Sequence, residues 1–378
     1  MNSLTEFLTD YRFSFSERPF CVIDSLLFTQ FSYLNCHKMV PRLEALGSLS
    51  YKGDSQLTQK PSFTHIFKSP EFGSIFDNYR IDKTLETIEG LATNPRYTDI
   101  TISEYINLME EGWSGPDFQP VQFAAYSLFL HNQFVYVVFR GTDDTMHGWY
   151  ESCQMACNYP VPAQTYTLRY LETIAHAYPQ LPLYVGGHSK GGNLAVYAAL
   201  NASEATKNRI VEVHDFDGPG FQPGDVGEKE FASLTGRVKK FIPQNSLFGL
   251  LLEERDEYRV VSSWGNMIEQ HDPYFWAIEN GNFVYFDTVD SRALRRQKVI
   301  SEWFASLSRE ELSVSIDALF ETIQAGGIES VLDLLVESPG EFSDIIRQSL
   351  ALTSPESKHT MQASLRSLLR TSLKHIAD

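Results

Sequence analysis

The chain has 378 residues, of which 43% are hydrophobic, enough for a sizeable core in one large domain with additions. Its 48 acidic side chains outnumber 31 basic ones, and the formal charge of −17 argues against nucleic acid as a partner and against general adhesion to anionic membranes. No apolar run is long enough to span a bilayer, and the amino terminus lacks the pattern of a secretory signal. Four scattered cysteines predict reduced thiols in a cytoplasmic protein rather than a disulfide framework or a metal site.

The first hundred residues, to about Thr101, carry no motif that can be assigned to chemistry, and within them residues 24–34 are expected to form a helix against the core. Apolar runs at 123–130 and 134–139, joined by a His-Asn turn, then predict an antiparallel hairpin that enters the central sheet. After the hairpin, strands alternate with helices, which predicts an α/β fold with a mostly parallel sheet and helices on both faces. The strands are expected at 183–186, 210–216, 238–242 and 258–262, and the helices at 166–177 and 191–200.

From Ser301 onward the pattern is helical. A capping box is expected at 308–311, and Pro355 marks a break between two helices. Leucines recur at helical spacing from Leu365 to Leu373. We expect the segment 365–376 to pack onto the catalytic domain rather than to lie on a membrane surface.

The stretch 183–199 is the most informative part of the chain, because an apolar β-type run passes through Gly-His-Ser-Lys-Gly into an alanine-rich helix. A serine at such a sharp turn needs small neighbours, which Gly187 and Gly191 supply, so that its Oγ projects above the sheet. The following helix directs unpaired N–H groups at the place where an oxyanion forms during acyl transfer. Ser189 is therefore the candidate nucleophile, and a turn that merely joins strand to helix is the alternative.

A serine hydroxyl requires a base, and His271 is the preferred one among ten histidines because it lies in a loop just after the apolar run 258–262. The tail histidines His359 and His375 are its rivals, and a histidine that only caps a helix is the structural alternative. The third member, a carboxylate, is expected at Asp217, in a turn after the strand 210–216. Asp215 is its nearest rival, and both aspartates are also common turn residues.

Oxyanion stabilisation needs two donors, and the main-chain N–H of Lys190 is the first. Thr142 follows a strong strand at the expected place for the second, with its N–H and a contribution from its hydroxyl. We expect Arg140 to be structural, paired with an acid such as Glu151 in the next helix. Cys153 and Cys157 lie four residues apart and are expected to share one face of that helix.

Three blocks of this sequence resemble those of the class 3 lipase-like α/β-hydrolases, at 139–142, at Trp149 with Glu151, and at 187–195. The nearest likeness is to a bacterial branch marked by the turn Gly-His-Ser-Lys-Gly-Gly-Asn, an Asp-Gly-Pro-Gly turn and a Gln-His-Asp-Pro loop, and it extends over residues 20–285. The resemblance implies an α/β-hydrolase fold with Ser189 as nucleophile, His271 as base and Thr142 as oxyanion donor. The sequence departs from typical secreted lipases around Asn245, where it has no aspartate, and Asp217 is similar instead to the acid of the pancreatic-type lipases.

These features predict a catalytic domain over 1–290, to which the first hundred or so residues are accessory, and a helical region over 291–378. The expected function is a serine hydrolase that cleaves small or lipid-like carboxylic esters through an acyl-enzyme, with no cofactor and no metal. Two alternatives remain: a binding or regulatory protein with a decayed site, and a thioesterase or peptidase that uses the same triad. Six apolar residues are candidates for an acyl pocket, although such clusters are more often ordinary core: Phe248, Leu250, Leu251, Leu252, Phe275 and Trp276.

Overall fold

An eight-stranded sheet forms the centre of the protein in the computed structural model. The structure describes residues 2–53, 57–75, 81–109, 113–115, 121–131, 133–253, 255, 257–328, 330–331, 334 and 339–375. Across the sheet the strands are β13 (Tyr285–Phe286), β10 (Tyr258–Val261), β9 (Val238–Pro243), β8 (Ile210–Phe216), β7 (Leu183–His188), β6 (Phe134–Phe139), β5 (Ala124–Leu130) and β3 (Ile100–Asn107). The pairings from β6 to β10 are parallel, and those that add β5, β3 and β13 are antiparallel. The predicted α/β-hydrolase fold with a mostly parallel sheet is confirmed.

The hairpin β5–β6 is confirmed as well, with Ala125 opposite Phe139 and Leu130 opposite Phe134, although Asn132 of its turn lies outside the described residues. Every residue of β6 is buried. Alternate side chains enter two different cores, Tyr136 and Val138 on one face and Val135 and Val137 on the other. A strand covered on both faces has no solvent-facing side, which explains its continuous hydrophobic sequence.

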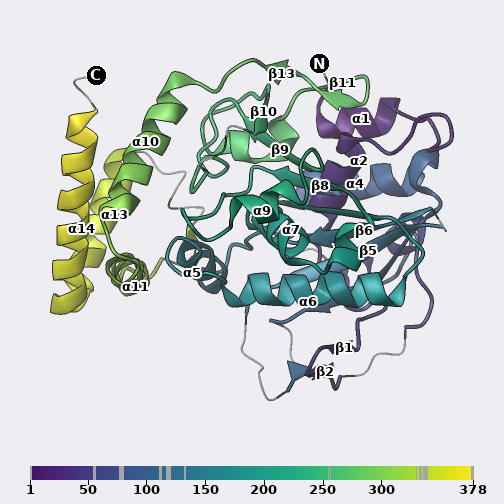
Figure 1. The fold of residues 1–378 in the computed structure, drawn as a ribbon, viewed down its shortest axis with the longest axis horizontal. Helices are drawn as coiled ribbons and strands as arrows, with labels where there is room; N and C mark the ends of the chain where they lie inside the picture. Colours follow the sequence, from purple (N-terminus) through teal and green to yellow (C-terminus); the bar gives the residue numbers. More distant parts are fainter. Residues whose placement is uncertain are drawn as a thin grey trace.

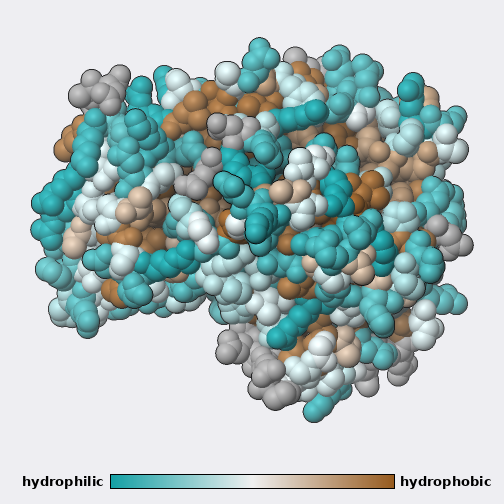
Figure 2. Space-filling view, in the orientation of Figure 1, coloured by the Kyte–Doolittle hydropathy of each residue, from teal (hydrophilic) through white to brown (hydrophobic). Residues whose placement is uncertain are grey.

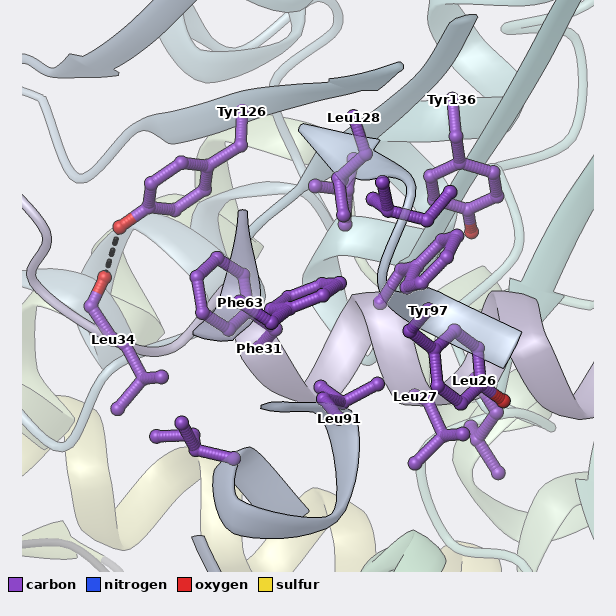
Figure 3. Close-up of a cluster of buried hydrophobic side chains, with 14 of the residues drawn as sticks. Leu26, Leu27, Phe31, Leu34, Phe63, Leu91, Tyr97, Tyr126, Leu128 and Tyr136 are labelled. Atoms are coloured by element: carbon purple, nitrogen blue, oxygen red, sulfur yellow. Dashed lines mark hydrogen bonds between the residues drawn. The ribbon is translucent and has the colours of Figure 1, made fainter. Parts of the chain in front are cut away.

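One face of the sheet is covered by helices from the amino-terminal hundred residues, which supply a large part of that core (Figure 3). The helices are α1 (Leu4–Asp10), α2 (Val22–Phe31), α3 (Phe63–Phe67) and α4 (Ile81–Thr93). In Figure 3 the Tyr126 hydroxyl of β5 donates a hydrogen bond to the carbonyl of Leu34, just beyond α2. The segment called accessory from the sequence thus forms one of the layers that enclose the sheet.

The other face packs against α6 (Pro162–Ala177) and α7 (Lys190–Asn201), whose apolar residues share a core with β5, β6 and β7. The remaining short helices are α5 (Met146–Gln154), α8 (Glu204–Lys207) and α9 (Glu228–Ala232). Two small sheets lie outside the main one: β1 (Ala45–Leu46), β2 (Leu49–Tyr51) and β4 (Trp113–Ser114) form the first, and β11 (Ile278–Glu279) and β12 (Asn282–Phe283) the second. Helix α5 ends before Cys157, so the expected single helical face for both cysteines is wrong, although Cys153 and Cys157 join the same apolar cluster.

The carboxy-terminal region gathers beside α5 at one end of the molecule (Figure 1). Its described helices are α10 (Ser291–Ala305), α11 (Arg309–Ala325), α13 (Pro339–Leu352) and α14 (Pro355–Lys374). The capping box at Ser308 and the break before Pro355 are confirmed. Among the described helices, none combines the length and apolar character needed to cross a bilayer. Within the same residues, no three His, Cys, Asp or Glu side chains are grouped as metal ligands would be.

Candidate active site

Ser189 occupies the tight turn between β7 and α7 with φ 58° and ψ −132°. A positive φ is strained for a residue with a side chain, and it persists only where the surroundings impose it. The close approach of the chain imposes it here, because a Cβ at Gly187 would lie 2.1 Å from the main chain of Gly191. A Cβ at Gly191 would in turn lie 2.3 Å from the carbonyl oxygen of Phe139. The two glycines are therefore required for the turn that presents Ser189.

Asp217 follows β8 directly and also has a positive φ of 54°. Its carboxylate is fully buried, and Oδ2 lies 2.6 Å from Nδ1 of His271. Oδ1 accepts hydrogen bonds from the hydroxyl of Ser246 at 2.6 Å and from the N–H of Gly249 at 3.1 Å. Burial raises the pKa of Asp217 to about 7, while the hydrogen bond from Ser246 acts in the opposite direction. Asp217 and His271 thus form a hydrogen-bonded pair in which the carboxylate fixes the orientation of the imidazole.

Asp215, the rival acid, belongs to a different network. Its Oδ1 accepts from the N–H of Gly218 at 2.8 Å, and its Oδ2 lies 3.5 Å from Nζ of Lys240. That ammonium group is 2.7 Å from Oε2 of Glu253. Because the backbone at Asp217 is left-handed, the two carboxylates point in different directions. That of Asp215 bonds to Gly218 and Lys240, whereas that of Asp217 bonds to His271.

His271 lies in a loop of two short 3₁₀ turns, Glu269–His271 and Pro273–Phe275. Its ring packs between Phe248 and His188, with ring centroids 4.3 and 4.6 Å away. Because His188 directly precedes Ser189, this packing brings the loop against the nucleophile turn. The tail rivals lie elsewhere: His375 pairs with Glu302 at 2.9 Å, and His359 lies on α14.

Three residues near this pair were missed by the sequence interpretation. The Nε2 of His188 lies 2.8 Å from the carbonyl oxygen of His271, and its Nδ1 lies 2.9 Å from the hydroxyl of Tyr33. Ser246, which binds Asp217, stands in the segment where the resemblance to secreted lipases would have placed the acid. The position of His188 beside Ser189 was a usable signal, whereas nothing local marks Tyr33, which is distant in sequence.

Lys190 begins α7, where the first N–H groups of a helix have no intrahelical acceptor. Thr142, in the loop after β6, lines the same cavity as Ser189 and Lys190. Its hydroxyl lies 2.7 Å from that of Ser152, which donates to the carbonyl of Gly148 at 2.8 Å. Since the hydrogen of Ser152 is used in this way, the Thr142 hydroxyl donates to Ser152. Of the two donors that Thr142 offers, the main-chain N–H is therefore the better candidate for an oxyanion donor, because the hydroxyl hydrogen is already used.

The side chain of Lys190 is buried and structural. Its Nζ lies 2.9 Å from Oε2 of Glu151 and 2.8 Å from the carbonyl of Gln122. Glu151 therefore pairs with Lys190, and its expected pairing with Arg140 is wrong. Arg140 instead donates from Nε to the carbonyl of Ser32 at 2.7 Å and from Nη2 to that of Leu34 at 2.9 Å. It thereby ties the end of β6 to the chain after α2.

A cavity of about 390 Å³ opens at Ser189 and is lined mainly by apolar side chains. Of the residues expected in an acyl pocket, Phe248, Leu251 and Leu252 line it. The other three lie elsewhere: Leu250 and Trp276 are buried in separate cores, and Phe275 packs against Trp264. The opposite wall comes from the carboxy-terminal helices, with Trp303 of α10, Ile316 of α11 and Leu368 of α14 among its residues. The cavity thus lies between the nucleophile turn and the helical region.

The sheet order and the serine turn define an α/β-hydrolase fold. The chain belongs to the Mbeg1-like family, whose sequence model matches residues 91–321. No curated protein sequence matches the chain.

Several solved structures are similar to this chain in fold. A mutant form of MDLA from Penicillium cyclopium is 14% identical with a TM-score of 0.38, and the match covers 70% of this chain and 83% of that one. Lip2 lipase from Yarrowia lipolytica is 11% identical with a TM-score of 0.35, with coverage of 60% and 98%. Lipase II from Rhizopus niveus is 14% identical with a TM-score of 0.31, with coverage of 54% and 76%. At such low identity the likeness concerns the fold alone.

Proposed function

We propose that this protein is a serine hydrolase that cleaves carboxylic esters, with Ser189 as nucleophile, His271 as general base and Asp217 as the acid. The observation that carries the proposal is the 2.6 Å contact between Asp217 and His271, in a loop packed against the turn that presents Ser189. A buried carboxylate on Nδ1 selects the tautomer in which Nε2 accepts a proton, and it stabilises the imidazolium that forms. This constellation is the one that activates a serine hydroxyl.

In the proposed reaction the Oγ of Ser189 attacks the ester carbonyl while His271 Nε2 takes the hydroxyl proton. The N–H groups of Lys190 and Thr142 stabilise the oxyanion of the tetrahedral intermediate. When the C–O bond to the alcohol breaks, His271 returns the proton to the leaving oxygen and an acyl-enzyme remains. Water, deprotonated by His271, then attacks the acyl carbon, which releases the carboxylic acid and restores Ser189.

The apolar lining of the cavity favours a substrate whose acyl group is aliphatic and is bound in the cavity. Its lining from α5, α11 and α14 is largely apolar, so an acyl chain would replace water there at a gain of roughly 0.8 kcal/mol per buried methylene.

We also infer a cytoplasmic location, which the four free thiols support. The alternative of a decayed, non-catalytic site was based on a missing late acid, and the contact between Asp217 and His271 weighs against it.

A fluorophosphonate probe tests the nucleophile, because it labels only an activated serine. Wild-type protein should be labelled and Ser189→Ala should not, while Ser16→Ala, which alters an exposed serine that does not line the cavity, should be labelled like wild type. Equal labelling of wild type and Ser189→Ala would reject the assignment. Rates on matched ester, thioester and amide substrates then distinguish an esterase from a thioesterase or a peptidase.

The acyl group is tested by narrowing the cavity. Ile316 lines the cavity from α11, and Val314 on the same helix is 53% exposed. Ile316→Phe should lower kcat/KM for p-nitrophenyl decanoate relative to the acetate by about tenfold, since an overfilled cavity costs on the order of 1–3 kcal/mol. Val314→Phe is the matched control and should leave that ratio unchanged. An unchanged ratio in Ile316→Phe would place the acyl chain elsewhere.

A further inference from the structure

Helix α14 carries a repeated pair, a leucine followed by a basic residue, at every fourth position. Residues four apart lie on the same side of a helix, so the leucines form one stripe and the basic residues form a second stripe, rotated by about 100° around the helix axis. We call these the leucine stripe and the basic stripe of α14. The pairs are Leu365 with Arg366, Leu369 with Arg370, and Leu373 with Lys374.

The leucine stripe is on the surface. Leu365 is 39% exposed, Leu369 is 61% exposed and Leu373 is 65% exposed. The helix packs against α10 and α11, and two of its side chains are buried: Thr371, and Met361, which lies one turn before Leu365 at the inner end of the stripe. In Figure 2 the surface over α14, at the left edge, is mostly hydrophilic, with a hydrophobic spot near the carboxy-terminal end. The segment 365–376 was expected to pack onto the catalytic domain, but in its described part, to residue 375, α14 packs mainly against α10 and α11.

The charge of α14 is opposite to that of the whole chain. The helix has four basic side chains and one acidic one, a formal charge of +3, whereas the chain carries −17. Within the part of the chain that the structure describes, Arg366 and Arg370 make no ion pair. An overall negative charge opposes adhesion to anionic lipid over most of the surface, so a basic helix with exposed leucines would select one orientation.

The same helix reaches the cavity at Ser189. Ser364 and Leu368 line the cavity from α14, and Leu365 both lines it and is partly exposed. The leucine stripe therefore starts at the cavity wall and continues outward along the helix. A surface that meets this stripe would lie next to the wall of the cavity.

We propose that the outer face of α14 docks onto an anionic lipid bilayer. The leucine stripe enters the boundary between headgroups and acyl chains, and the basic stripe contacts lipid phosphates. An amphipathic helix with basic residues beside its apolar ones binds such surfaces by the two contributions together. The inference concerns binding alone and is independent of the proposed catalysis.

Flotation with lipid vesicles tests the docking, and the use of Ser189→Ala protein separates it from turnover. This protein should float with vesicles of phosphatidylcholine containing 30% phosphatidylglycerol at 0.1 M salt, and should remain unbound with pure phosphatidylcholine. Arg366→Glu with Arg370→Glu should weaken binding at least about tenfold, because each basic residue near an anionic surface contributes on the order of a factor of five. Leu369→Ser with Leu373→Ser should also weaken it, and 1 M salt should release the protein.

The matched control makes the same change of charge elsewhere. Lys52→Glu with Lys229→Glu alters two exposed lysines of the catalytic part and should bind like the parent. Circular dichroism and thermal melting establish that each variant is folded. Failure of the folded parent to bind anionic vesicles would overturn the proposal, as would equal loss in the control. A dimer in solution that Leu369→Ser with Leu373→Ser dissociates, without vesicle binding, would assign the stripe to a second copy instead.

Discussion

The imidazole of His188 holds the main chain of His271, with Nε2 2.8 Å from the carbonyl oxygen. A carbonyl oxygen only accepts, so Nε2 carries the hydrogen, and in the neutral ring Nδ1 then accepts from the hydroxyl of Tyr33 at 2.9 Å. The residue before the candidate nucleophile thereby fixes the loop that carries the candidate base. We regard His188 as a positioning residue, which acts through His271.

His188→Leu removes this support and should lower kcat about 10- to 100-fold, because small misplacements of a catalytic group cost that much. His188→Gln restores a donor near the position of Nε2 and should recover most of the activity. The rate of fluorophosphonate labelling should follow the same order, with KM changed little. If His188→Leu and His188→Gln are equally active and both close to wild type, the hydrogen bond from His188 to the carbonyl of His271 has no positioning role.

The pH dependence of hydrolysis should reflect the buried carboxylate. Burial raises the pKa of Asp217 to about 7, and only its ionised form stabilises the imidazolium, so kcat/KM should rise between pH 5 and pH 8. The hydrogen bond from Ser246 favours the ionised form. Ser246→Ala should therefore shift the midpoint of the Asp217–His271 pair upward, by about one pH unit.

Ser233→Ala removes the hydroxyl of a half-buried serine that donates to the carbonyl of Glu230, away from Asp217, and should leave that midpoint where it is in wild type. A midpoint that stays constant or moves downward in Ser246→Ala would contradict the account of Asp217. Full pH profiles of kcat/KM for one p-nitrophenyl ester make the comparison.

The ion pair of Lys190 with Glu151 should matter for stability, since both side chains are at most 8% exposed. Lys190→Met leaves an unpaired buried carboxylate and should reduce the free energy of unfolding by about 3–5 kcal/mol. Lys190→Met with Glu151→Leu removes both charges and should lose less than the single variant. Urea denaturation of the three proteins measures this, and a single variant as stable as wild type would exclude the structural role.

The turn at Ser189 could be predicted because its requirement is local: two glycines are needed within five residues, and both are visible in the sequence. Asp217 was likewise marked by its place at the end of a strand. The pairing of Glu151 was predicted wrongly because Arg140 and Lys190 are both plausible partners, and the choice depends on how α5 lies against the serine turn. That orientation is a property of packing, which no local pattern encodes.

Tyr33 and the carboxy-terminal wall of the cavity could not be predicted for a related reason. Tyr33 meets His188 across 155 positions of sequence, and the leucines of α14 have the same spacing whether they face a core, a cavity or solvent. The sequence therefore indicated the groups that we propose for the chemistry, while the groups that support and enclose them required the three-dimensional arrangement.

The contribution of α10, α11 and α14 to the cavity has a consequence for the newly made chain. During synthesis, Ser189 and His271 leave the ribosome well before Leu368, which lines the cavity near the far end of the sequence. A nascent polypeptide would thus hold Ser189 and His271 without an enclosed cavity until these late helices dock. Translation itself would delay the appearance of the complete candidate site.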